Sequence, residues 1–147
     1  MATAISRMAA LTALALMMGC GGGSVNREPL RALEGDPMAA YVPPGGSVLR
    51  DDRLDERSGG GLDKPRPATL RRSLSLPPDG AAGAVPAAAA AARDAGWKVG
   101  APAGDGVTAR RRIGDRDATL VVTLVRNPAL VPEGRVPALS VELEALR

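Results

Sequence analysis

Four arginines are the residues of this sequence that are best suited to binding a ligand. Arg110, Arg111 and Arg112 are consecutive, and Arg71 lies in an earlier segment of alternating apolar and polar residues. In an extended strand Arg110 and Arg112 share one face, while Arg71 points to the solvent face of its own segment. If the two strands are neighbours, Arg71, Arg110 and Arg112 form a basic patch. Guanidinium groups suit phosphate and carboxylate partners, so the patch would bind anions.

The same arginines also fit an interpretation without any ligand. Charged side chains keep an edge strand from pairing with another chain, and Glu142 and Glu144 on the last predicted strand could balance them. Arg111 is harder to place, because alternation puts it on the apolar face with Ala109 and Ile113. It must therefore lie at a margin of the sheet, or the register of the strand differs.

Residues for catalysis are scarce. The chain has no His, which excludes Ser-His-Asp and Cys-His arrangements and removes the commonest metal ligand. The acidic pairs Asp51–Asp52 and Asp55–Glu56 lie in a segment without a regular apolar pattern, and turn chemistry explains Asp115 and Asp117. We therefore predict no catalytic residue, no metal and no cofactor, and an accessory enzyme is only a remote alternative.

Cys20 is the only cysteine and stands just after an apolar run. Met8–Met18 is apolar apart from Thr12, and Arg7 is the only charge before it. These eleven residues are too few to cross a bilayer core, which needs about 20 helical residues. A short apolar run behind a positive charge is instead typical of a secretory signal peptide.

The cysteine also has a characteristic context. Met17-Met18-Gly19-Cys20 resembles the lipobox of bacterial lipoproteins, although the motif prefers leucine at the position of Met17. The resemblance covers only about the first 20 residues. It implies that residues 1–19 are a signal peptide and that the sulfur of Cys20 is acylated, which anchors the protein in the cell membrane. The alternative is an ordinary signal peptide or a buried segment with an unmodified cysteine.

Composition indicates one small domain with a mildly basic surface. The 147 residues include no Phe, one Trp and one Tyr, so the core is expected to consist mostly of Leu and Val. Residues 68–147 carry eleven basic and eight acidic side chains, a net charge of +3. This charge is too small to indicate a dedicated nucleic-acid binder, and we predict no nucleic-acid partner.

Residues 20–67 are predicted to be a disordered tether. Pro and Gly recur there, no apolar period is sustained, and residues 50–57 form a mixed-charge run. Such a composition cannot bury enough apolar surface to offset the entropy lost on ordering, and a flexible coil of this length spans roughly 35–40 Å. Residues 37–49 contain the only Tyr and are either linker or a segment that docks on the domain or a partner. A short helix at Glu28–Leu33 is a further option.

Residues 68–147 are predicted to be an α+β domain with the element order β-α-β-β-β. Alternation predicts strands at Ala68–Leu76, Val107–Ile113, Ala118–Val125 and Ala138–Leu146. Arg72 interrupts the apolar face of the first strand. An alanine-rich helix is expected at Gly83–Ala95, with Pro86 in its first turn and Gly96 as a left-handed cap. One antiparallel sheet with this helix on one face is the simplest packing.

These observations together favour a non-catalytic lipoprotein of the cell envelope, at the periplasm or the cell surface. Its domain is expected to bind another envelope protein through the open face and edge of the sheet. The alternative function is binding of an anionic polymer or of lipid headgroups through Arg71, Arg110 and Arg112. Salt distinguishes the two, because binding through arginines weakens steeply with ionic strength and an apolar contact does not.

Overall fold

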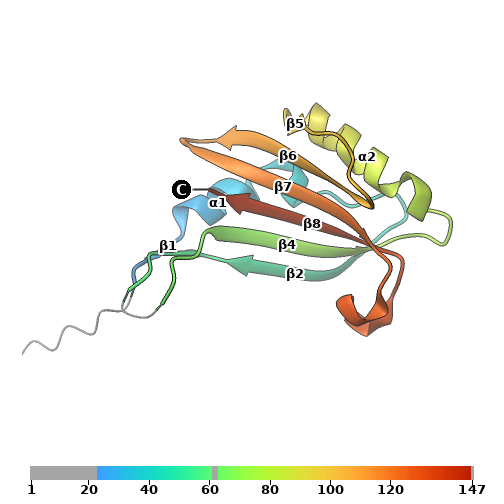
Figure 1. Cartoon of the computed structure of the whole chain (residues 1–147), viewed down its shortest axis with the longest axis horizontal. Helices are drawn as coiled ribbons and strands as arrows, with labels where there is room; N and C mark the ends of the chain where they lie inside the picture. The colour runs from blue at the N-terminus through green and yellow to red at the C-terminus, as the bar shows by residue number, and fades with distance from the viewer. Residues whose placement is uncertain (1–22, 61–62, 147) are drawn as a thin grey trace, which may run out of the picture.

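A twisted antiparallel sheet of six strands is the centre of the fold (Figure 1). The computed structural model describes residues 23–60 and 63–146, so the predicted signal peptide and Cys20 lie outside the described residues. The order of the sheet is β2-β4-β8-β7-β6-β5. Its strands are β2 (Val48–Leu54), β4 (Ala68–Ser75), β5 (Lys98–Val99), β6 (Gly106–Ile113), β7 (Arg116–Val125) and β8 (Ala138–Ala145).

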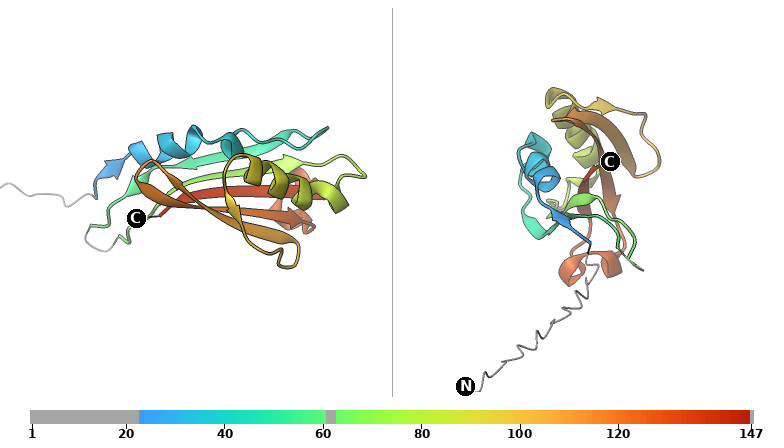
Figure 2. Two further views of the ribbon diagram at one scale, coloured as in Figure 1. Left: turned by 90° about the horizontal axis from the view of Figure 1, so that it is seen from above. Right: turned by 90° about the vertical axis from the view of Figure 1, so that its left-hand side faces the viewer.

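Two helices cover the same face of this sheet (Figure 2). The first, α1 (Glu28–Glu34), contacts β4 and β8, and the second, α2 (Ala81–Asp94), contacts β5, β6, β7 and β8. Three short 3-10 helices and a separate pair of strands complete the fold: η1 (Pro37–Ala39), η2 (Pro128–Leu130), η3 (Pro132–Gly134), β1 (Val25–Asn26) and β3 (Glu56–Arg57).

The α+β class is confirmed, and the four strands predicted from alternation are present as β4, β6, β7 and β8, with the short strand β5 added between α2 and β6. Alternation succeeds because it decides which side chains of a strand enter the core. On β8, Leu139, Val141 and Leu143 are fully buried, while the residues between them are half-exposed. Gly96 has φ +85° and ends α2 as expected. The amide N–H of Trp97 donates to the carbonyl of Ala92 at 2.9 Å, which closes the last turn of the helix.

The start of α2 differs from the sequence prediction. The helix begins at Ala81, two residues before Gly83, so Pro86 lies within the helix and not in its first turn. A proline at that position has no N–H to donate to the carbonyl four residues earlier, that of Ala82. Both Ala82 and Pro86 are exposed, so water can bond to this carbonyl and the helix tolerates the proline.

Residues 25–57 differ most from the sequence analysis, which predicted a disordered tether there. They form α1, η1, β2 and the small β1–β3 sheet, and Leu33, Met38 and Ala39 enter the core with 0%, 1% and 7% exposure. Of the two alternatives for residues 37–49, docking on the domain is therefore confirmed for part of the segment. The short helix predicted at Glu28–Leu33 is also present, as α1. Within residues 23–60 and 63–146 two α-helices lie on the sheet where one was predicted, and β2 adds an edge strand.

Arg72 explains how this N-terminal segment is held. It lies on the core face of β4 and is only 7% exposed. Its Nη1 donates to the carbonyls of Ala39 and Tyr41 at 2.9 and 2.8 Å, and its Nε lies 3.5 Å from Oδ2 of Asp51. A guanidinium on an apolar face needs such acceptors, and the N-terminal segment supplies them.

Candidate functional site

The face of the sheet opposite α1 and α2 is polar, and neither of these two α-helices covers it. We call it the open face. It presents the half-exposed and exposed positions of the three central strands: Thr69, Arg71, Ser73, Ser75, Thr119, Val121, Thr123, Val125, Ser140, Glu142 and Glu144. All of these side chains are hydroxyl or charged groups except Val121 and Val125 on β7. The open face therefore offers many hydrogen-bonding groups to a partner.

A shallow hollow of about 370 Å³ lies on the open face between β2, β4, β8 and β7. Two ion pairs border it. Arg71 Nε donates to Oε2 of Glu142 at 2.7 Å, and Arg50 Nε lies 2.6 Å from Oδ2 of Asp52. Leu130 of η2 also lines the hollow and is 71% exposed. The hollow therefore combines balanced charges with one projecting apolar side chain.

Arg71 does not join the other predicted anion-binding residues. It is the register partner of Glu142, and the hydrogen bond to this carboxylate raises the pKa of Arg71. Strands β8 and β7 separate β4 from β6, so three strand spacings, about 14 Å in total, lie between Arg71 and the arginines of β6. The expected patch of three arginines is therefore not formed.

Arg110 and Arg112 do lie together, and Lys98 joins them. Lys98 of β5 is the register partner of Arg110, and Arg112 follows two positions later on β6. We call these three residues the basic corner. They line a shallow hollow of about 420 Å³ in which Asp117 is the only carboxylate. Lys98 was missed from the sequence, because only the pairing of β5 with β6 brings it there.

Arg111, the residue whose placement the sequence left open, turns to the core side and binds Asp36. The Nη1 of Arg111 donates to Oδ2 of Asp36 at 2.8 Å and also to the carbonyl of Ala95. The other carboxylate oxygen accepts from Nε1 of Trp97 at 3.1 Å and from the amide of Met38 at 2.9 Å. The side chain of Asp36 is 1% exposed, so this cluster is structural and links η1 to the end of α2.

The acidic residues 51–56 are also bound by arginines. A hydrogen bond from Arg53 is the main cause that lowers the pKa of Asp51, with Arg53 and Arg72 adding attraction. Glu56 is 8% exposed and accepts from Nη1 of Arg116 at 2.8 Å. No group of three or more acidic, His or Cys side chains in the described part of the chain could hold a metal ion.

Comparison with protein-family models, with curated proteins and with solved structures finds no match to this chain. No helix within residues 23–60 or 63–146 is long and apolar enough to cross a membrane. Cys20, the predicted site of lipidation, lies outside both ranges.

Proposed function

We propose that the chain is a non-catalytic lipoprotein of the cell envelope, anchored through Cys20, and that its domain binds a partner protein with the open face. The apolar run before Cys20 supports the anchor. The open face supports the partner, because both helices lie on the other side of the sheet and leave it accessible.

The main support for a protein partner is the hollow on the open face beside Leu130. Its two arginines and two carboxylates balance, so it would not attract a polyanion. Fixed charges, hydroxyls and one exposed Leu instead match the mixture of a polar rim and an apolar anchor that protein interfaces use. We therefore infer a partner protein whose surface complements this pattern.

Site-specific photocrosslinking in an envelope preparation tests this proposal. A photoreactive phenylalanine at Thr123 or Leu130, both on the open face, should give one adduct of defined mass. The same residue at Ala90, which is exposed on α2, should give none. Equal adducts at all three positions, or none from the open face, would contradict the proposal.

The anchor is tested separately by the mass and membrane partitioning of the protein made in a bacterial host. A mature chain that begins at Cys20 and carries diacylglycerol is expected, and Cys20→Ser should abolish both the modification and the partitioning. An unmodified, soluble wild-type protein with its N-terminus intact would remove the anchor from the proposal.

The basic corner supports a second candidate function, binding of an anionic polymer or anionic headgroups. Within residues 23–60 and 63–146 Arg110 forms no ion pair, and it faces Lys98 directly. Adsorption to phosphatidylglycerol vesicles should fall steeply with salt and be lost in the double variant Arg110→Glu, Arg112→Glu. Each single variant, Arg110→Glu or Arg112→Glu, should weaken adsorption more than Arg31→Glu on α1, which makes the same change of charge elsewhere. Equal adsorption to neutral phosphatidylcholine vesicles would refute this function.

A further inference from the structure

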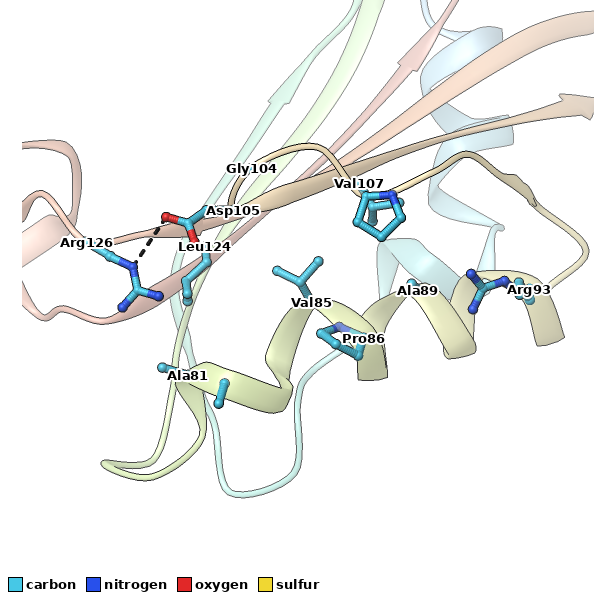
Figure 3. Close-up of a pocket in the computed structure, with 12 residues that line it drawn as sticks. Ala81, Val85, Pro86, Ala89, Arg93, Gly104, Asp105, Val107, Leu124 and Arg126 are labelled. Atoms are coloured by element: carbon cyan, nitrogen blue, oxygen red, sulfur yellow. Dashed lines mark hydrogen bonds and ion pairs between the residues drawn. The ribbon is translucent and has the colours of Figure 1, made fainter.

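A second hollow lies on the helix side of the sheet, away from the open face. We call it the α2 cleft (Figure 3). It has a volume of about 340 Å³ and separates α2 from β6 and the end of β7. It exists because the helix presents mostly alanine, whose side chain is too short to fill the space above the sheet. Its apolar lining comes from Ala81, Val85, Pro86, Ala89, Val107 and Leu124.

Charged groups lie only at the two ends of the α2 cleft, as Figure 3 shows. At one end Arg126 Nε lies 3.3 Å from Oδ2 of Asp105, with both side chains more than half exposed. At the other end stands Arg93, which forms no ion pair within the described ranges. An exposed pair such as Arg126–Asp105 is worth little, so Arg93 is the cation best placed to receive an anion.

The dimensions of the α2 cleft indicate an elongated ligand. Its lining runs from Ala81 to Arg93, twelve residues along one helix, which corresponds to about 18 Å at 1.5 Å per residue. Its volume lies at the lower end of the range of small-molecule sites, roughly 300–1,000 Å³. A long, narrow ligand fits this space better than a compact ring system.

We infer that the α2 cleft binds a single-chain amphiphile with an anionic head, with the head at Arg93 and the aliphatic chain along Val85 toward Leu124. The side chains between the two ends are hydrocarbon. An aliphatic chain needs no hydrogen bonds there, whereas the backbone of a bound peptide would leave N–H and C=O groups unpaired at a cost in free energy. The cation at Arg93 matches an anionic head group and gives the chain a direction.

Displacement of dansyl-labelled undecanoate from the full chain carrying Cys20→Ser tests the inference. Dodecanoate should displace the probe, octanoate should displace it less well, and dodecanol should bind more weakly because it lacks the charge. Val85→Trp fills the cleft and should weaken dodecanoate binding at least tenfold. Ala90→Trp, an equally large addition on the exposed side of α2, should leave binding unchanged.

A second pair of variants keeps the test valid if Val85→Trp disturbs folding. Arg93→Glu should weaken binding of dodecanoate about tenfold, as expected for loss of a charge-assisted hydrogen bond and its replacement by a repulsive charge. It should leave the binding of dodecanol unchanged. Arg31→Glu on α1 makes the same change of charge away from the cleft and should have no effect.

Lysophosphatidylglycerol distinguishes the source of the ligand. Displacement by dodecanoate alone would identify a free fatty acid, and displacement by the lysolipid as well would identify a membrane-derived amphiphile. No displacement by either, or equal losses in Val85→Trp and Ala90→Trp, would overturn the inference. The open face lies on the other side of the sheet, so this result and that of the crosslinking experiment are independent.

Discussion

Replacing Asp36 should destabilise the whole domain, because this buried carboxylate joins three elements. It accepts hydrogen bonds from Arg111 of β6, from Trp97 beyond α2 and from the amide of Met38 in η1. Asp36→Ala removes all three acceptor contacts. It leaves the indole N–H of Trp97, a residue with 3% exposure, without a partner.

The magnitude follows from these contacts. A hydrogen bond to a charged group contributes about 1.5–3 kcal/mol, and an unsatisfied buried donor costs about 1–3 kcal/mol. Arg111 can still reach water because its side chain is 34% exposed, which limits the loss. We expect Asp36→Ala to lower the free energy of unfolding by about 3–5 kcal/mol. Asp36→Asn keeps an acceptor oxygen for Trp97 and should cost about 1–2 kcal/mol.

Urea unfolding followed by circular dichroism and by the fluorescence of the single Trp97 measures both losses. With a slope of about 1.5 kcal/mol per molar urea, Asp36→Ala should lower the midpoint by about 2–3 M. Asp105→Ala, which removes only the exposed pair with Arg126, serves as control and should cost less than about 1 kcal/mol. A shift of the midpoint smaller than about 0.5 M, roughly a quarter of the smallest expected shift, would show that the contacts of Asp36 do not stabilise the domain as proposed.

Three further predictions concern the sheet and its N-terminal segment. A chain truncated after Ala138 should lose its native far-ultraviolet circular dichroism, since β8 lies between β4 and β7; a retained spectrum would count against this. Arg72→Met should cost about 2–4 kcal/mol in urea unfolding, because the carbonyls of Ala39 and Tyr41 lose their donor. Limited proteolysis should then cut first within residues 23–57, and unchanged resistance there would contradict the role of Arg72. Arg53 lowers the pKa of Asp51, so Asp51 adds stability above its unfolded pKa of about 3.9 that is lost as pH falls through the lower folded value. Asp51→Asn should therefore lose less stability than wild type as the pH falls below about 4, and parallel plots of melting temperature against pH would show that this ion pair does not contribute.

Strands β4, β6, β7 and β8 could be predicted because each one carries its own alternation of apolar and polar residues. Leu139, Val141 and Leu143 alternate with polar residues on β8, and all three are fully buried. Gly96 could be predicted as the residue that ends α2, because the left-handed backbone conformation after a helix is adopted most readily by glycine. Such local patterns need no knowledge of the partner strand, and they fix the elements without fixing their order in the sheet.

The role of residues 25–57 could not be predicted from local patterns, because distant contacts order them. Asp36 bonds to Arg111, 75 positions away, and Arg72 bonds to Ala39, 33 positions away. A signal did exist in the sequence. Arg72 and Arg111 both fall on apolar faces, so each required a buried acceptor, and Asp36 lies in the segment that supplied it.

In the candidate site too, local patterns predict some features and distant contacts decide the others. Arg71, Arg110 and Arg112 were correctly placed on the solvent face of their strands. Whether they meet depends on the order β4-β8-β7-β6, which no local pattern determines. The pairing of β4 with β8 places Arg71 next to Glu142, which is 71 positions away in the sequence. Arg110 and Arg112 lie near the opposite edge of the sheet, next to Lys98.

The position of β1 has a consequence for how the domain would stand on a membrane. Its first residue, Val25, follows Cys20 by five positions, and an extended chain covers at most about 3.6 Å per residue. Under the proposed acylation, the fold would therefore begin within about 18 Å of the lipidated residue. The β1–β3 end of the sheet would face the bilayer, while η2, η3 and the start of α2 lie at the opposite end (Figure 1). The strands would then stand upright, and a partner would reach the sheet from the side, parallel to the membrane surface.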